Sequence, residues 1–539
     1  MGLMDEKMCE IKFLPDGLTA RVAPDTPLTE AADAAGARIG RHCGGAGVCG
    51  KCRVRTGADD PLSPVSETER GALGEAGIKE GLRLSCCARV VRDGSVTIVD
   101  RVESKGHSIL EGFSDGISDW APDAKGYGVS VDIGTTTVVC YLFDLDGHES
   151  IDKISFLNPQ VAFGDDVISR IAYASSSPDA LPRIQSVLTE EMDKSLGVLA
   201  ERNGIKKEEI TEIVIAGNTV MEHLFAGVSP ESIGRSPYTP QFLTYPPFPA
   251  SKLGIRINEN GIIKMLPNVA GYVGADIVAG VAALGMERAE GVTLLVDIGT
   301  NNEIVIGSRD GLFCCATAAG PAFEGARIQY GMRASTGAIE KVYMDGGELR
   351  CKTIGGAKPV GLCGSGLIDA IMVVLREGVV EPSGRFTAPE KCVDPRFAKR
   401  LGRNENGMVR LLLTDEENPI YLTQKDIREV QLAAGAVKVG TEVMLERAGI
   451  TKDEIAEVCL AGAFGNNIDI ESAAAAGLIP DIDRAKIRGV KNSSGLGASL
   501  ALASAEFYER TKAVAEKMKY VELSSLPDFQ KRFVKAMAF

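Results

Sequence analysis

A motif that occurs twice restricts the fold of this sequence more than any other feature. The segment VSVDIGTTTVV at residues 129–139 has a counterpart in LLVDIGTNNEIVIG at residues 294–307. In both copies a hydrophobic strand ends in Asp-Ile-Gly-Thr, and a second hydrophobic strand follows after two or three residues. The repeat predicts two copies of one fold unit that face each other across a cleft.

The rest of the chain divides around this repeat. Strands alternate with helices from Gly128 onward, which predicts layered α/β lobes over 127–290 and 291–539, the second ending in a helical tail. Residues 1–100 predict a small β-rich domain that includes a helix at LTEAADAAG, with Thr29 as its candidate cap. Residues 101–126 mix turn residues with little periodicity and predict a linker. Several domains are expected in a chain of 539 residues.

The loop RHCGGAGVCGKCRV, at residues 41–54, carries the special cysteine chemistry. Cys43, Cys49 and Cys52 form a C-x5-C-x2-C array among closely spaced glycines. An iron–sulfur cluster needs four thiolates and a tightly bent backbone, and glycine reaches positive φ angles freely. The alternative is a zinc site, but zinc sites usually consist of two separate short-spaced cysteine pairs.

The fourth thiolate is expected in the segment LRLSCCARV, as Cys86 or Cys87. Cys86 is preferred because Leu-x-Cys followed by Ala-x-Val resembles the ligand segment of ferredoxins. Plant-type ferredoxins have a C-x4-C-x2-C spacing, and the extra residue here is similar to vertebrate-type ferredoxins. The predicted metal ligands are Cys43, Cys49, Cys52 and Cys86.

Charge patterns restrict the partners. The net charge of −14 disfavours nucleic acid and anionic membranes. Around the cysteine loop the charge is instead positive, which either offsets the negative charge of a cluster or forms a docking patch for an acidic electron-transfer partner. The residues concerned are Arg38, Arg41, Lys51, Arg53 and Arg55.

A cytoplasmic location is expected. Thirteen cysteines are consistent with a reducing compartment. The sequence has no run of eighteen apolar residues that would predict a membrane span, and its start does not resemble a secretory signal.

The repeated motif has the chemistry of a phosphate site. A strand delivers Asp132 to the cleft, where its carboxylate can hold the hydration shell of Mg²⁺. Gly134 allows the chain to turn, and the following amides and hydroxyls can cradle phosphate. Asp297 begins the same arrangement in the second half. The predicted residues of these loops are Gly134, Thr135, Thr136 and Thr137, then Gly299, Thr300, Asn301 and Asn302.

Two further strand-to-helix joints, at Gly217–Asn218 and near Gly462, complete an order that resembles the actin, sugar kinase and heat-shock chaperone superfamily. The resemblance implies an adenosine loop at Gly462, Ala463, Phe464 and Gly465. It also implies that Asp276 orients or deprotonates the nucleophile, alongside Asp132 and Asp297 as catalytic residues. A helix cap is the alternative role for Asp276.

The whole chain resembles the reductive activators of corrinoid-dependent enzymes. The segments that carry this resemblance are NPQVAFGDDVISRI, AGNTVMEHLFAG, AAGPAFEGARIQYGMRA, LCGSGLIDA and NSSGLGA. The implied fold is α+β and multidomain: a β-grasp [2Fe–2S] ferredoxin-like domain followed by duplicated ribonuclease H-like (actin-like) ATPase lobes. The implied cofactors are a [2Fe–2S] cluster, ATP and Mg²⁺.

The implied activity is ATP-dependent reduction of cobalt(II) to cobalt(I) in the corrinoid protein of a methyltransferase system. A low-potential electron donor is implied as a further partner, and the resemblance also suggests a homodimer. Three alternatives stay open. They are a metabolite kinase with a fused redox-regulatory domain, an electron donor similar to the dehydratase activators, and a redox-sensing scaffold that binds nucleotide without hydrolysing it.

Overall fold

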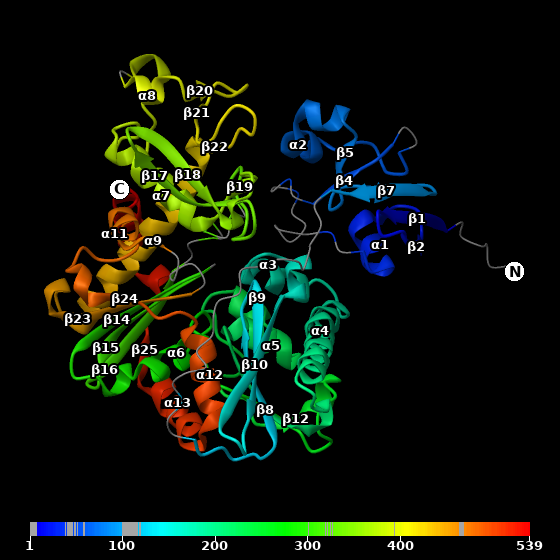
Figure 1. Cartoon of the computed structure of the whole chain (residues 1–539). Helices are drawn as coiled ribbons and strands as arrows, with labels where there is room; N and C mark the ends of the chain where they lie inside the picture. The colour runs from blue at the N-terminus through cyan, green and yellow to red at the C-terminus, as the bar shows by residue number, and fades with distance from the viewer. Residues whose placement is uncertain are drawn as a thin grey trace, which may run out of the picture.

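The computed structural model of this chain describes residues 8–37, 39, 47, 50, 52–57, 60–99, 117, 120–299, 301–317, 320, 322–323, 325, 327–392, 394–462 and 468–539. They form an N-terminal unit, here residues 8–99, and two larger lobes (Figure 1). The first lobe is built on the sheet within residues 127–265, and the second on the sheet within residues 292–520.

The N-terminal unit has a mixed sheet with the strand order β2-β1-β7-β4-β5. β1 pairs antiparallel with β2 and parallel with β7. The tight turn between β1 and β2 is possible because Gly17 has a φ of +73°. The strands are Cys9–Leu14 (β1), Leu18–Val22 (β2), Arg53–Arg55 (β4), Leu82–Leu84 (β5) and Gly94–Ile98 (β7), with a small pair Thr26–Pro27 (β3) and Arg89–Val90 (β6).

Two helices pack on this sheet. The first, Leu28–Ala35 (α1), has Pro27 at its N-cap, so the prediction that Thr29 caps it was wrong. Because Pro27 pairs with Arg89 in the β3–β6 sheet, the helix begins directly after it, at Leu28. The second, Glu67–Lys79 (α2), begins with a capping box between Ser66 and Glu69.

The first lobe has a six-stranded sheet in the order β10-β9-β8-β11-β13-β12. β8 forms an antiparallel hairpin with β9 and pairs in parallel with β11 on its other side. The strands are Tyr127–Ile133 (β8), Thr137–Asp144 (β9), Glu149–Leu157 (β10), Ile210–Gly217 (β11), Phe248–Pro249 (β12) and Ile262–Met265 (β13).

The second lobe has the order β24-β23-β14-β15-β16-β25, which repeats five strands of the first lobe, while the sixth strand, β25, extends the opposite edge from β12. β14 forms the hairpin with β15 and pairs in parallel with β23, as β8 does with β9 and β11. The predicted duplication is therefore confirmed. The strands are Val292–Ile298 (β14), Asn302–Ser308 (β15), Gly311–Thr317 (β16), Ile455–Ala461 (β23), Ile487–Gly489 (β24) and Met518–Tyr520 (β25).

Helices cover both sheets, and two small sheets extend the second lobe. The helices are Val167–Ala174 (α3), Ala180–Arg202 (α4), Thr219–Ala226 (α5), Ala275–Leu284 (α6), Gly364–Arg376 (α7), Pro395–Ala398 (α8), Gln424–Ala448 (α9), Ile470–Ala476 (α11), Ser493–Ala503 (α12), Ala505–Lys517 (α13) and Phe529–Ala536 (α14). The small sheets contain Ala338–Asp345 (β17), Glu348–Thr353 (β18) and Gly361–Leu362 (β19), and Leu401–Arg403 (β20), Val409–Leu412 (β21) and Tyr421–Thr423 (β22).

Strand periodicity decides which side chains face the space between the lobes. Val131 of β8 belongs to a hydrophobic core on the outer side of the first lobe. Because successive strand residues point to opposite faces, Asp132 shares its face with Ser130, which hydrogen-bonds Ser499 of α12 at 2.8 Å. In the second lobe, Asp297 shares its face with Leu295, which lies in a core built from both lobes.

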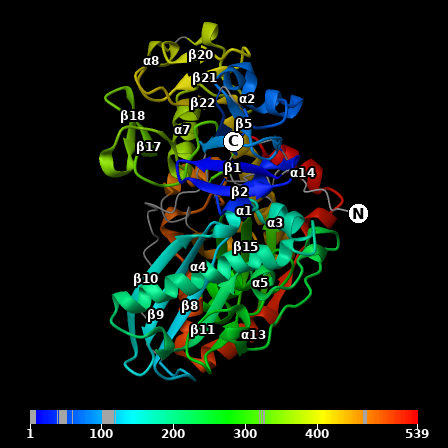
Figure 2. The same ribbon diagram turned by 90° about the vertical axis from the view of Figure 1, so that its right-hand side faces the viewer.

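The lobes are joined through that common core. α6 and α12 lie between the two large sheets (Figure 1), and their residues pack with strands of both lobes. The N-terminal unit touches the first lobe through Asp33 of α1 and Arg183 of α4, 3.4 Å apart, and Figure 2 shows α1 beside α3 and α4. No helix in the described part of the chain is long and apolar enough to span a membrane.

Candidate functional site

Two thiols of the predicted cluster site converge in the N-terminal unit. Cys52 precedes β4 and is 2% exposed, while Cys86 follows β5. Their Sγ atoms are 3.3 Å apart, and the Cys87 Sγ lies 3.7 Å from that of Cys86. The backbone amide of Ser85 donates to the carbonyl of Cys52, which fixes the two segments together. Cys43 and Cys49 lie outside the described residues.

Two glycines that precede Cys52 lie against α2 and beside Cys87. A Cβ atom at Gly47 would be 2.7 Å from the Thr68 side chain and 3.0 Å from the Cys87 Sγ. A Cβ atom at Gly50 would be 3.2 Å from the carbonyl oxygen of Ala72. Both glycines have positive φ angles, +74° and +66°. Two converging thiols beside glycine positions that have no room for a side chain fit a [2Fe–2S] cluster.

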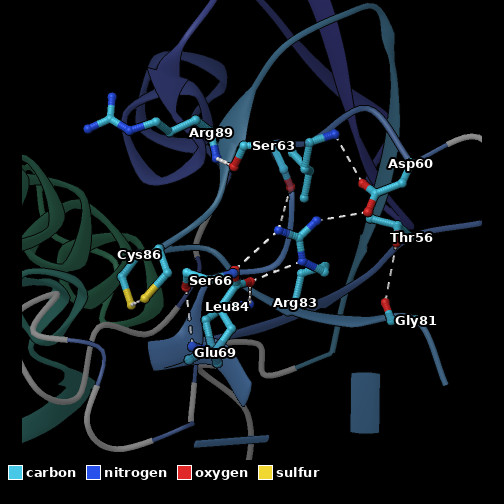
Figure 3. A network of polar contacts seen from close by, with 12 residues as sticks. Thr56, Asp60, Ser63, Ser66, Glu69, Gly81, Arg83, Leu84, Cys86 and Arg89 are labelled. Carbon is cyan, nitrogen blue, oxygen red and sulfur yellow. Dashed lines mark hydrogen bonds and ion pairs between the residues drawn. The ribbon is translucent and has the colours of Figure 1, made fainter. Parts of the chain in front are cut away.

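A buried ion network holds the strand that carries Cys86 (Figure 3). Arg83 of β5 is 2% exposed, and its Nε donates to Glu69 Oε1 at 3.0 Å, while its Nη1 donates to Asp60 Oδ2 at 2.8 Å. Burial would raise the pKa of Glu69, but the hydrogen bond from Arg83 and those from backbone amides outweigh it and lower this pKa. Glu69 also accepts from the amide of Leu84, so the network clamps β5 to α2 two residues before Cys86.

The first aspartate of the cleft is held from far along the sequence. Asp132, half-buried at the end of β8, accepts hydrogen bonds from Asn492 Nδ2 and Ser494 Oγ, both at 2.8 Å. Asn492 caps α12, and Ser494 lies in its first turn. The carboxylate is therefore positioned by the helix that crosses between the lobes.

The first phosphate loop turns its carbonyl oxygens into the lobe. Asn158 Nδ2 donates to the carbonyl of Gly134 at 2.9 Å, and the Asn158 amide donates to the carbonyl of Thr136 at 2.9 Å. Arg170 donates to the carbonyl of Thr135. Within the described residues, the amides of Thr135 and Thr136 donate no hydrogen bond. A loop with satisfied carbonyls and available amides is suited to an anion.

Close packing explains why the turn of the first phosphate loop needs Gly134. Asn218, which directly follows β11, supports the same turn. A Cβ atom at Gly134 would lie 2.6 Å from the carbonyl oxygen of Thr137. Asn218 Nδ2 donates to the hydroxyl of Thr135 at 3.0 Å, and its Oδ1 accepts from the amide of Met221 to cap α5. The start of α6 packs on the same point, because a Cβ at Gly274 would be 2.5 Å from Asn218 Cα.

The second phosphate loop is equally tight. The amide of Gly299 donates to Asn302 Oδ1 at 3.1 Å. Asn302 is fully buried, and its Nδ2 has no partner among the residues that the structure describes. Gly462, with a φ of +86°, follows β23, and a Cβ there would lie 2.6 Å from Asp297 Oδ1. Thr300, Ala463, Phe464 and Gly465 lie outside the described residues.

Acidic side chains from both lobes meet in the cleft. Burial first, and then the neighbouring Asp297 and Asp132, raise the pKa of Asp276 to about 8. Burial and Asp132 raise the pKa of Asp297 to about 7. Glu303, 7% exposed and opposite Asp297 in the β14–β15 register, has its pKa raised by burial, then by Asp276 and Asp297.

Such a concentration of carboxyl groups fits a cation that would lower these pKa values. Nowhere in the described ranges do three acidic, histidine or cysteine side chains lie close enough to hold a bare ion together. A hydrated Mg²⁺, which keeps several of its waters, fits this spacing. Asp276 lies in the first turn of α6, whose N-cap is Gly274, so the alternative role as a helix cap is not supported.

Several residues of this site were not singled out from the sequence. Asn158 and Arg170 lie in NPQVAFGDDVISRI, and Asn492 and Ser494 lie in NSSGLGA. These residues could have been found because each is a polar residue within an otherwise hydrophobic or glycine-rich motif. Glu303 had a weaker signal, as an acid within the strand that follows the second phosphate loop.

Comparison with protein families matches the chain over most of its length. Residues 291–539 match the "C-terminal domain of RACo the ASKHA domain", and residues 127–289 match the "RACo middle region". Residues 11–91 match the "2Fe-2S iron-sulfur cluster binding domain".

Individual proteins agree with these matches. The chain is 37% identical over 413 residues to the "Corrinoid activation enzyme RamQ" of Eubacterium limosum, covering 76% of this chain and 69% of that protein. It is 24% identical over 409 residues to the "[Co(II) methylated amine-specific corrinoid protein] reductase" of Methanosarcina barkeri, covering 70% of each. A solved structure named "Reductive activator for corrinoid,iron-sulfur protein" is similar over 98% of both chains, with a TM-score of 0.69 and 32% identity.

Proposed function

This chain belongs to the family of reductive activators of corrinoid-dependent enzymes, and on that premise we propose that it couples ATP hydrolysis to the reduction of a corrinoid protein. The cysteine thiolates would hold a [2Fe–2S] cluster that could supply one electron to cobalt(II), which would become cobalt(I) while the cluster lost that electron. A low-potential donor would then have to return one electron to the cluster. The observation that carries this proposal is the likeness to a reductive activator over 98% of both chains.

The need for ATP follows from redox energetics. When bound, a plant-type [2Fe–2S] cluster supplies an electron at about −400 mV. The cobalt couple that the family reduces lies below this range, and each step of about 59 mV uphill opposes a one-electron transfer tenfold. Nucleotide-driven closure of the lobes can overcome this only if the closed state binds the corrinoid protein differently from the open state.

Each predicted site residue has a role in this proposal. Cys43, Cys49, Cys52 and Cys86 bind the cluster, and the 3.3 Å approach of Cys52 to Cys86 supports this set. Asp132 and Asp297 hold hydrated Mg²⁺, and Asp276 orients the attacking water. The phosphates bind to Gly134, Thr135, Thr136, Thr137, Gly217, Asn218, Gly299, Thr300, Asn301 and Asn302, and adenosine binds to Gly462, Ala463, Phe464 and Gly465.

We propose domain boundaries at 1–100, 127–290 and 291–539, with 101–126 as a linker; the family matches to 11–91, 127–289 and 291–539 support them. The corrinoid protein belongs to a methyltransferase system, and the activator works in the cytoplasm, as a homodimer. The relatives named for corrinoid proteins favour this function over a metabolite kinase.

An anaerobic spectrum tests the proposal. The chemically reduced holoprotein is mixed with a methyltransferase corrinoid protein in the cobalt(II) state, with and without MgATP. Cobalt(I) should accumulate only with ATP, and Asp297→Asn should abolish this. Asp310→Asn, an exposed aspartate after the neighbouring strand, is the matched control. Equal cobalt(I) formation without ATP over repeated rounds would contradict the proposal.

The choice between Cys86 and Cys87 has its own experiment. Cys86→Ser should lose most of the iron and sulfide of the purified protein, or shift the electron paramagnetic resonance signal of the cluster. Cys87→Ser should leave both as in the unmodified chain. If Cys87→Ser lost the cluster and Cys86→Ser retained it, Cys87 would be the fourth ligand.

A further inference from the structure

A buried arginine lies directly behind the first phosphate loop. Arg170, on α3, is fully buried and comes from the motif NPQVAFGDDVISRI. Its guanidinium donates to the carbonyl of Thr135 in that loop. A unit positive charge is thus one residue layer away from the predicted position of the phosphates.

All hydrogen-bond partners of this guanidinium are neutral. Nε donates to the carbonyl of Gly164 at 2.9 Å, and Nη1 contacts Met221 Sδ at 3.0 Å and Gln160 Oε1 at 3.5 Å. Among the described residues Arg170 forms no ion pair within 4.0 Å. Asp166 instead caps α3 by accepting from the amide of Ser169 at 2.7 Å.

The other buried cations of the described chain behave differently. Arg83 pairs with Glu69 and Asp60, at 3.0 and 2.8 Å. Lys264 pairs with Glu212 and Asp123, at 3.0 and 3.1 Å. Buried charges are normally paired because an unpaired charge loses its hydration without compensation. Arg170 is therefore the exception, and it is located next to an anion site.

Burial lowers the pKa of Arg170 to about 9, against the more distant attraction of Asp165 and Asp166. The positive charge of Arg333, which precedes the β17 strand of the second lobe, lowers this pKa further. A bound polyphosphate would offset the charge of Arg170.

We propose that Arg170 is a positioning residue that acts as a built-in counter-charge for the phosphates of the bound nucleotide. It holds the carbonyl of Thr135 so that the loop amides face the cleft, and a bound polyphosphate adds to the partial compensation of its charge by Asp165 and Asp166. This inference rests on the proposed nucleotide site. The competing view is a neutral brace that connects α3 to the loop and has no electrostatic role.

Ligands of increasing charge separate the two views. Binding of adenosine, ADP and ATP to the holoprotein is measured by calorimetry for Arg170→Gln, which retains a hydrogen-bond donor without charge, and for Arg170→Lys. With Gln, the affinity for ATP should fall at least tenfold and that for adenosine less than twofold. With Lys, the affinity for ATP should stay within about threefold of the unmodified protein. Arg202→Gln, which removes an exposed pair with Asp152 on the same lobe, is the matched control.

Each result decides the question. Equal losses for adenosine and ATP, or a Lys variant as weak as the Gln variant, would reduce Arg170 to a brace and overturn the inference. If Arg170→Gln does not fold, Arg170→Lys provides the test through its ratio of ATP affinity to adenosine affinity. The inference predicts the same ratio as in the unmodified protein, and a tenfold fall in this ratio would contradict the inference. Failure of the unmodified protein to bind ATP would instead remove the proposed function itself.

Discussion

His223 illustrates how burial sets the chemistry of one residue. It is fully buried in α5 and stacks on Phe242 with ring centroids 4.0 Å apart. The amide of Gln241 donates to Nε2 at 3.1 Å, so Nδ1 carries the proton and donates to the carbonyl of Thr219. Burial lowers the pKa of this imidazole from 6.5 to about 4.

This lowered pKa gives a pH dependence of stability. The unfolded chain binds a proton below pH 6.5 that the folded chain resists until about pH 4. The contribution of His223 is complete above pH 6.5 and is lost as the pH falls through 4, by roughly 3 kcal/mol. Urea unfolding should show that the free energy of unfolding of the unmodified protein, relative to that of His223→Gln, is smaller at pH 4 than at pH 7 by that amount. His148→Gln is the matched control for loss of an imidazole, and an advantage independent of pH would contradict the expectation.

At the same scale, two glutamates of α2 each pair with an arginine but differ in burial. Glu69 is fully buried against Arg83, whereas Glu75 pairs with Arg70 on the surface at 2.8 Å. Removing one partner of a buried pair costs about 3–5 kcal/mol because the other charge is left uncompensated. Surface pairs are worth about 0–1 kcal/mol. Glu69→Gln should therefore lower the urea midpoint for loss of cluster absorbance far more than Glu75→Gln, and similar midpoints would count against the clamp at Cys86.

At the scale of elements, the contact between α6 and α12 depends on glycine. A Cβ at Gly497 of α12 would lie 2.2 Å from the carbonyl oxygen of Ala279 in α6. Gly497→Ala should cost about 1–3 kcal/mol by overpacking, and it should lower the ATPase rate because α12 also positions Asp132.

A second helical glycine supplies the control. At Gly197 of α4 the nearest atom to a Cβ is 4.0 Å away, on the Lys207 side chain. Gly197→Ala should stabilise the protein by about 0.5–1 kcal/mol, because alanine loses less backbone freedom on folding. Thermal unfolding of both variants measures the contrast. If both variants changed the stability in the same direction, the close approach of α6 and α12 would not be the reason that Gly497 is needed.

At the scale of the whole molecule, the hydrophobic cores predict how the protein unfolds. The core of the N-terminal unit contains only residues between Cys9 and Ile98, whereas one core is shared by both lobes. Among the residues that the structure describes, one salt bridge, Asp33–Arg183, joins the N-terminal unit to the first lobe, and its arginine is 41% exposed. Such a contact is worth about 0–1 kcal/mol, so the N-terminal unit should unfold independently of the lobes.

Two probes measure this independence. Visible absorbance of the cluster follows the N-terminal unit, and far-ultraviolet circular dichroism is dominated by the helical lobes. MgATP at about 100 times its Kd should stabilise the lobes by about 2.7 kcal/mol and leave the cluster transition unchanged. A single transition seen by both probes, or an equal shift of both, would mean that the units unfold together.

Much of the fold and part of the site could be predicted because the relevant signals are local. Hydrophobic runs that end in Asp132 and Asp297 are bounded by their own turns, and they became the hairpins β8–β9 and β14–β15. The helix cap at Thr29 was a local prediction that failed, because strand pairing at Pro27 decides where that helix begins. Cys52 and Cys86 are far apart in the sequence, and they were expected to converge because one cluster needs four thiolates.

The sequence alone determined which units are present: a cysteine loop, two phosphate loops and a duplicated lobe, because each is encoded in contiguous residues. The tertiary structure decided what surrounds them. Asn492 and Ser494 reach Asp132 across 360 and 362 residues of chain, and Arg170 binds the carbonyl of Thr135 and forms no ion pair with any residue that the structure describes. The physical reason is that a contact between distant segments is selected by the packing of whole helices and sheets, which no short stretch of residues specifies.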